Sequence, residues 1–129
     1  MKHRILVVED NPLNAELLAE WLETEGYEVS SASELKAAFT AIENLQPHAV
    51  LLDVQLGGED GLFVATWMRQ QRALRYIPII AVTAHAMANE RDSILRAGCN
   101  AYVPKPVDFK LLRETLERWL PSRVSESAS

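Results

Sequence analysis

Five polar residues of the chain have side chains suited to binding a metal ion and to accepting a phosphoryl group: Glu9, Asp10, Asp53, Thr83 and Lys105. Carboxylates that are brought together repel one another, and a divalent cation supplies the counter-charge that keeps them ionised. An all-oxygen ligand set favours a hard cation, so Mg²⁺ is the expected ion and Mn²⁺ an alternative. A carboxylate can also attack phosphorus to give an aspartyl-phosphate, while the metal and a lysine ammonium neutralise charge on the transferring group.

Each of these residues, taken alone, has an ordinary structural explanation. Asp10 could cap a helix, Asp53 could be a turn residue, and Lys105 before a proline is a weak turn signal. Their joint position decides the interpretation. Glu9 and Asp10 follow one apolar run, and Asp53, Thr83 and Lys105 each follow another. The carboxyl ends of parallel strands meet at one edge of a sheet, where ligands bind. At that edge the Thr83 hydroxyl could donate a hydrogen bond to a phosphoryl oxygen.

The elements that would position these residues are five apolar runs separated by helical patterns. The runs do not alternate with polar residues, which is typical of strands covered on both faces. Strands that alternate with helices predict βαβ units, a parallel sheet and right-handed crossovers. The expected strands are residues 5–8, 27–29, 49–52, 77–82 and 101–103, and the expected helices are residues 12–25, 34–46, 62–74, 88–97 and about 112–120.

Several helix details can also be predicted. Asn11 is expected to cap the first helix, and Ser33 can cap the second. The apolar stripe of the first helix consists of Leu13, Leu17 and Trp21 with the neighbours Leu18 and Leu22. Three arginines spaced by three residues predict a solvated helix face, with anion binding as the alternative interpretation: Arg69, Arg72 and Arg75.

Composition limits the classes of protein to consider. A chain of 129 residues with 48% hydrophobic residues fits one domain, expected at residues 1–121 with a disordered tail at 122–129. The net charge of -5 disfavours direct nucleic-acid binding. Cys99 is the single cysteine, which suits a reducing cytoplasm, and the apolar runs are too short for a signal peptide or a membrane span. A cytoplasmic protein without a membrane segment is therefore expected.

The ordered set of motifs resembles the response-regulator receiver domains of two-component signalling, over about residues 2–120. The matching segments are residues 5–11, 51–56, 59–61, 80–84 and 101–106. The resemblance implies a flavodoxin-like α/β fold, with a doubly wound five-stranded parallel sheet in the order 2-1-3-4-5 and five helices. The segment 10–14 is similar to receivers of hybrid kinases and of stand-alone phosphorelay proteins, and the start at Met1 and the polar tail favour a stand-alone protein.

The resemblance implies a role for each residue of the acidic site. Asp53 would be the phosphoacceptor. Asp10, Asp53 and the backbone carbonyl of Gln55 would bind the metal, with Glu9 acting directly or through water. Lys105 would contact the phosphoryl group.

Further residues would act around the site. Thr83 would contact the phosphoryl group and reorient toward it, and Tyr102 would be the aromatic switch that follows Thr83. Asn14 would face the mouth of the site. His85 stands two residues past Thr83 and is expected at the rim.

One departure from the family concerns the loop after Asp53. The family commonly has a proline after the position of Leu56, whereas this chain has Gly57 and Gly58. Two glycines predict a more flexible loop. The family also leads us to expect a cis bond between Lys105 and Pro106.

The leading hypothesis is a receiver that accepts a phosphoryl group from a histidine kinase or a histidine phosphotransferase and then changes its binding to a downstream protein target. It would catalyse its own phosphorylation without being a turnover enzyme, and it would be a monomer or a phosphorylation-dependent dimer. The alternative is a phosphorylation-independent adaptor with the same fold. A phosphatase is disfavoured because Gln55 stands where a general acid is needed.

Overall fold

The computed structural model describes residues 2–84 and 87–120, which are built around one five-stranded parallel sheet. The strands lie in the order β2-β1-β3-β6-β7, and each neighbouring pair is parallel. Numbered along the chain within this sheet, the order is 2-1-3-4-5, so the predicted topology is confirmed. The strands are β1 (Arg4–Val8), β2 (Glu28–Ala32), β3 (Ala49–Asp53), β6 (Ile79–Thr83) and β7 (Ala101–Pro104).

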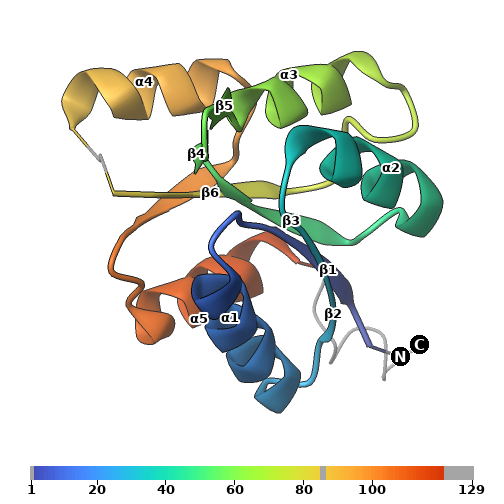
Figure 1. The fold of residues 1–129 in the computed structure, drawn as a ribbon, viewed down its shortest axis with the longest axis vertical. Coiled ribbons are helices and arrows are strands. Elements are labelled where there is room, and N and C mark those ends of the chain that lie inside the picture. The colour runs from blue at the N-terminus through green and yellow to red at the C-terminus, as the bar shows by residue number, and fades with distance from the viewer. Residues whose placement is uncertain (1, 85–86, 121–129) are drawn as a thin grey trace.

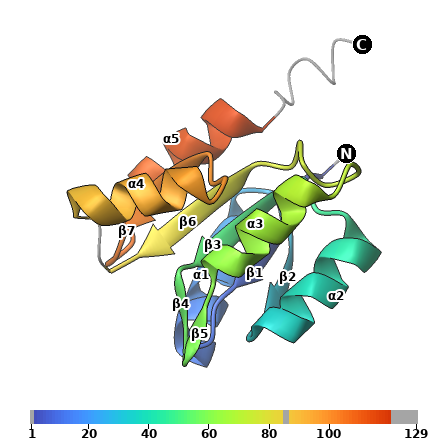
Figure 2. The same ribbon diagram turned by 90° about the horizontal axis from the view of Figure 1, so that it is seen from above.

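Helices cover both faces of the sheet and give three layers (Figures 1 and 2). One face carries α2 (Leu35–Leu45), α3 (Leu62–Gln70) and α4 (Ala88–Arg96), and the other carries α1 (Pro12–Thr24) and α5 (Phe109–Trp119). The doubly wound, flavodoxin-like fold that was expected is therefore confirmed. Within the described ranges, no helix has the length and apolar character needed to cross a membrane.

Alternation along β1 explains why its apolar run is unbroken. Successive strand residues point to opposite faces of a sheet. Ile5 and Val7 pack in the core with α1 and α5, while Leu6 and Val8 pack in the core on the other face. Both faces are covered, so all four side chains are buried.

A short antiparallel hairpin follows β3 and was not predicted. Its strands are β4 (Gln55–Leu56) and β5 (Glu59–Asp60), joined by the two glycines. Gly57 has a φ of 59°, a left-handed value that glycine adopts without steric cost. The glycine pair therefore serves as the two-residue turn of a hydrogen-bonded hairpin.

The helix ends agree only partly with the prediction. Asn11 caps α1 as expected, because its side chain accepts hydrogen bonds from the N–H groups of Leu13 and Asn14. Ser33 does not cap α2; Glu34 occupies that position, and its side chain makes no capping hydrogen bond. The third helix ends at Gln70, short of its predicted end, because the backbone at the following residue is extended.

Only part of the predicted apolar stripe of α1 is buried. Leu13 and Leu17 are 71% and 57% exposed. Leu18 and Leu22, which are four residues apart and also belong to the predicted stripe, face the sheet and are buried. Residues one position earlier are rotated by about 100° on a helix, so they fall outside the covered face.

Candidate functional site

The carboxyl edge of the sheet brings the predicted residues together. Glu9 and Asp10 follow β1, Asp53 ends β3, Thr83 ends β6, and Lys105 follows β7. They line a cleft of about 240 Å³ together with Asn11, Asn14, Gln55 and Ala84. Residues from four strand ends therefore meet in one cleft, as the sheet topology requires.

Three carboxylates form the acidic part of this cleft. Glu9, Asp10 and Asp53 each place one carboxylate oxygen within 4.8 Å of the other two. Glu9 and Asp53 are only 4% and 6% exposed, whereas Asp10 is exposed. Clustered oxygen donors of like charge are the ligands of a hard divalent cation. The donor set therefore fits Mg²⁺.

Lys105 supplies the positive charge of the cleft. Its Nζ donates to Glu9 Oε1 at 3.1 Å and to Asp53 Oδ2 at 3.0 Å. Burial acts to lower the pKa of Lys105, but the hydrogen bonds to Asp53 and Glu9 outweigh it and leave the pKa above its ordinary value. The ammonium therefore stays protonated beside Asp53 at neutral pH.

Backbone N–H groups donate hydrogen bonds to the second oxygen of each buried carboxylate, the one that does not contact Lys105. Asn11 N–H donates to Glu9 Oε2 at 3.1 Å, and Gln55 N–H donates to Asp53 Oδ1 at 3.1 Å. Each buried carboxylate thus has one oxygen toward Lys105 and one toward the backbone. This arrangement holds the Asp53 side chain in a defined orientation at the carboxyl end of β3.

The remaining predicted residues differ in their positions. Thr83 is buried and lines the cleft, while Asn14 is exposed at its mouth. Tyr102 is half-buried outside the cleft, and its hydroxyl accepts a hydrogen bond from Arg91 Nη1 of α4 at 3.2 Å. His85 lies outside the described residues. The peptide bond between Lys105 and its following proline is cis, as the resemblance implies.

Gly61, which is not among the predicted site residues, supports the loop after Asp53. Its N–H donates to Val54 O at 2.7 Å. A Cβ at this position would overlap the carbonyl oxygen of Asp53 and lie 3.1 Å from that of Val54. Its φ of -61° is ordinary, so the close approach of the backbone requires glycine here. In the sequence, a glycine directly before a predicted helix was the available signal.

Replacement of Gly61 with alanine is expected to lower the free energy of unfolding by about 2 kcal/mol, because the loop must move away from the new Cβ. Gly58→Ala is the matched control, since a Cβ at Gly58 meets no atom within 4 Å. Urea unfolding followed by circular dichroism measures both. Equal stabilities of the two variants would contradict the close approach.

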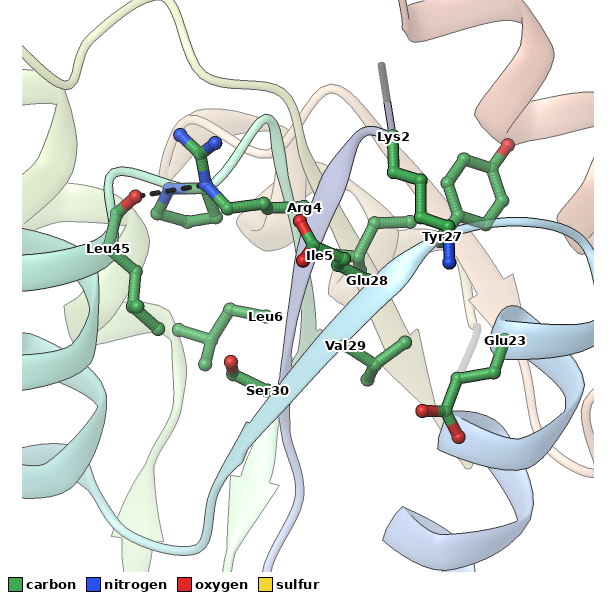
Figure 3. Close-up of a pocket in the computed structure, with 11 residues that line it drawn as sticks. Lys2, Arg4, Ile5, Leu6, Glu23, Tyr27, Glu28, Val29, Ser30 and Leu45 are labelled. Atoms are coloured by element: carbon green, nitrogen blue, oxygen red, sulfur yellow. Dashed lines mark hydrogen bonds between the residues drawn. The ribbon is translucent and has the colours of Figure 1, made fainter.

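A second hollow, of about 390 Å³, lies at the opposite end of the strands (Figure 3). Lys2 and Arg4 line it together with Glu23 and Glu28, and Arg4 Nε donates to the carbonyl oxygen of Leu45 at 3.3 Å. Its charges are of both signs, and none of the predicted site residues lines it. The cleft at the carboxyl edge is therefore the candidate site.

Comparison with known families agrees with this geometry. The sequence model of the response regulator receiver domain matches residues 5–117. The chain belongs to the response regulator receiver domain family. The resemblance predicted from the motifs is thus confirmed, and the acidic cleft corresponds to the place where a receiver domain is expected to carry its phosphorylation site.

Relatives with similar sequences support the same family. The polar-differentiation response regulator DivK of Brucella ovis is 39% identical over 121 residues, which cover 93% of this chain and 98% of DivK. The DivK of Brucella anthropi is 38% identical over the same shares of both chains.

Solved structures agree in fold. The receiver domain of the sensor histidine kinase PA1611 from Pseudomonas aeruginosa, with a magnesium ion coordinated in its active site cleft, is 35% identical. It superimposes with a TM-score of 0.85 over 95% of this chain and 100% of its own. The chemotaxis protein CheY4 of Vibrio cholerae has a TM-score of 0.87 over 93% of this chain and 100% of its own length. At 22% identity, CheY4 supports the fold alone.

Proposed function

We propose that this receiver domain accepts a phosphoryl group on Asp53 from a phosphohistidine of a histidine kinase or histidine phosphotransferase, in a Mg²⁺-dependent reaction. The observation that carries the proposal is the position of Lys105 Nζ, which lies 3.0 Å from Asp53 and 3.1 Å from Glu9 within a cleft lined by three carboxylates. The magnesium described in the PA1611 receiver and the response-regulator name of the DivK relatives support it.

The chain offers ligands for one Mg²⁺ ion. Asp10, Asp53 and the backbone carbonyl of Gln55 would hold it, with Glu9 contributing directly or through water. When bound, the ion neutralises charge on the carboxylates and on the phosphoryl oxygens. Mn²⁺ prefers the same oxygen donors and would replace it.

Asp53 is the proposed nucleophile. One of its carboxylate oxygens forms a bond to phosphorus while the bond from phosphorus to the donor imidazole nitrogen breaks. The donor ring that reacts already carries a proton on its other nitrogen, so the electron pair of the broken bond stays with the imidazole and the ring leaves neutral. Lys105 would donate a hydrogen bond to the phosphoryl group, and the Thr83 hydroxyl would donate another after reorienting.

The phosphoryl group would then act as a switch. Movement of Thr83 would favour an inward position of Tyr102, whose hydroxyl accepts a hydrogen bond from Arg91 on α4. The surface formed by α4, β7 and α5 would change, and a downstream protein would bind one of the two states more tightly. The domain would be a monomer or a phosphorylation-dependent dimer in the cytoplasm. It is a signalling protein in this proposal, without turnover of a substrate.

Incubation with acetyl phosphate and Mg²⁺ tests the proposal directly. Intact-protein mass spectrometry is expected to show the addition of one phosphoryl group, and peptide mapping is expected to place it on Asp53. Asp53→Asn should remove the addition, because an amide oxygen is a poor nucleophile, and chelation of the metal should prevent it. If wild type and Asp53→Asn remain equally unmodified, phosphorylation is excluded and the adaptor alternative is favoured.

A further inference from the structure

The hairpin after Asp53 holds one of the proposed metal ligands. Gln55, whose carbonyl is proposed to bind Mg²⁺, begins β4 and pairs with Asp60 of β5. The turn consists of Gly57 and Gly58, and a Cβ at Gly58 would meet open space. The turn residues themselves therefore restrict the hairpin little, and its position must come from contacts of its strands.

Contacts with several elements hold the strands in place. On β5, Asp60 Oδ1 accepts a hydrogen bond of 2.9 Å from the N–H of Leu62, the first residue of α3. On β4, Leu56 is 2% exposed and belongs to the core between the sheet and α2–α4. On β5, Glu59 Oε1 accepts a hydrogen bond of 3.2 Å from the N–H of Leu35, the first residue of α2. Glu59 pairs with Leu56 in the hairpin, so the contact of Leu56 with the core and that of Glu59 with α2 hold the same residue pair. Figure 2 shows the hairpin at the edge of the sheet where α2 begins.

The contact of Glu59 satisfies a donor that α2 itself leaves open. The first N–H groups of a helix have no partner within the helix, and the residue before it commonly accepts from them. Glu34 occupies this position but makes no side-chain capping bond. Glu59 takes over the capping from 24 residues away, and its negative charge is also favourable at the positive end of the helix dipole.

We propose that Glu59 is a positioning residue for the metal site. By capping α2 it fixes β5, and the pairing of β5 with β4 then fixes the carbonyl of Gln55 at the mouth of the cleft. Glu59 thus restricts a hairpin whose two glycine turn residues leave its backbone conformationally flexible. The role rests on the proposed function, because it requires Gln55 to be a metal ligand.

Titration of ¹⁵N-labelled protein with MgCl₂ alone tests this role, with the amide signals of Asp10 and Gln55 reporting the Kd. Glu59→Ala is expected to weaken Mg²⁺ binding about fivefold, the range expected for loss of one capping hydrogen bond. Glu59→Gln should stay within about twofold of wild type, because the amide oxygen accepts the same bond without the charge. Glu34→Gln removes an exposed charge from the same helix end without touching the hairpin.

Amide hydrogen exchange at Leu35 gives a second readout that does not depend on metal. Faster exchange is expected in Glu59→Ala, with wild-type exchange in Glu59→Gln. A Glu59→Ala variant with lower stability but an unchanged Kd would overturn the role, because Glu59 would then be merely structural. Equal weakening by Glu59→Ala and Glu59→Gln would also overturn it, since charge would explain the effect. A wild-type domain that bound no Mg²⁺ would overturn the proposed function and this role with it.

Discussion

Replacement of Lys105 with methionine is expected to slow phosphorylation of Asp53 by acetyl phosphate about 100-fold, the usual effect of removing one donor that stabilises charge in a transition state. Methionine is also unbranched, is one atom shorter than lysine, and carries no charge. The Nζ atom that it removes lies 3.0 Å from Asp53 Oδ2, so it is within reach of a group bonded to that carboxylate. The initial rate of phosphoprotein formation, followed by intact-protein mass spectrometry, measures the effect.

The same variant is expected to show a changed response to Mg²⁺. Without lysine, the buried carboxylates of Glu9 and Asp53 lose their ammonium partner. We expect the metal-free protein to lose about 2 kcal/mol of unfolding free energy, below the effect at a fully buried pair because the Lys105 side chain is 24% exposed. Saturating Mg²⁺ should recover most of this loss, because the ion supplies the missing counter-charge. Thermal unfolding with and without MgCl₂ measures the recovery.

Lys110→Met is the matched control for Lys105→Met. Lys110 is an exposed residue in the first turn of α5, so the substitution removes the same charge at a surface position. It should leave both the phosphorylation rate and the Mg²⁺ response close to wild type. Equal rates for the two methionine variants would show that Lys105 does not act on the phosphoryl group.

Much of the sheet and of the acidic cleft could be predicted because each depends on local sequence. Strands buried on both faces need continuous apolar runs, and these runs mark the strand ends without any tertiary information. Parallel topology then places Asp53 beside Glu9, Thr83 and Lys105 at one edge. The position of a residue directly after a run was therefore sufficient to assign it to the cleft.

Features that depend on contacts between distant segments could not be predicted in this way. The strands of the hairpin have two residues each, which is too short to give a period. The bond from Leu35 to Glu59 spans 24 positions, and nothing in the sequence near either residue indicates it. The exposure of Leu17 depends on how α1 is rotated about its axis on the sheet. Because the leucines of α1 lie on two adjacent stripes, the apolar pattern alone does not show which stripe is buried.

Arg69 shows the same limit for a charged residue. Its spacing from Arg72 and Arg75 predicted one solvated helix face, but α3 ends at Gln70 and the three side chains do not share a helix. The guanidinium of Arg69 turns inward and is half-buried. Burial lowers its pKa below the ordinary arginine value. The interpretation as a solvated residue was therefore wrong for Arg69.

Arg69 joins three segments at the amino edge of the sheet. Its Nε donates to Gly98 O at 2.9 Å, and Nη1 donates to Arg75 O at 2.8 Å and to Ile77 O at 3.0 Å. Its Nη2 donates at 2.9 Å to Asn100 Oδ1, which also accepts from the N–H that starts β6. The planar guanidinium thus connects the end of α3, the loop before β6 and the loop after α4.

Arg69→Ala is accordingly expected to lower the free energy of unfolding by about 3 kcal/mol, because several acceptors lose a charged donor together. The thermal midpoint should fall by about 10 °C. Arg69→Lys should recover only part of the loss, since one ammonium cannot replace a fork that reaches four oxygens. Arg72→Ala, at an exposed neighbouring position, should stay within about 0.5 kcal/mol of wild type.

The rate of phosphorylation distinguishes the effect of Arg69→Ala from that of Lys105→Met. Arg69 acts at the amino ends of β6 and β7, whereas Asp53 and Lys105 lie at the carboxyl edge. At a temperature where Arg69→Ala is still folded, its rate of phosphorylation by acetyl phosphate should be close to that of wild type. A rate reduced as strongly as in Lys105→Met would mean that the two edges of the sheet are coupled. A thermal midpoint unchanged from Arg72→Ala would mean that the guanidinium contacts contribute little to stability.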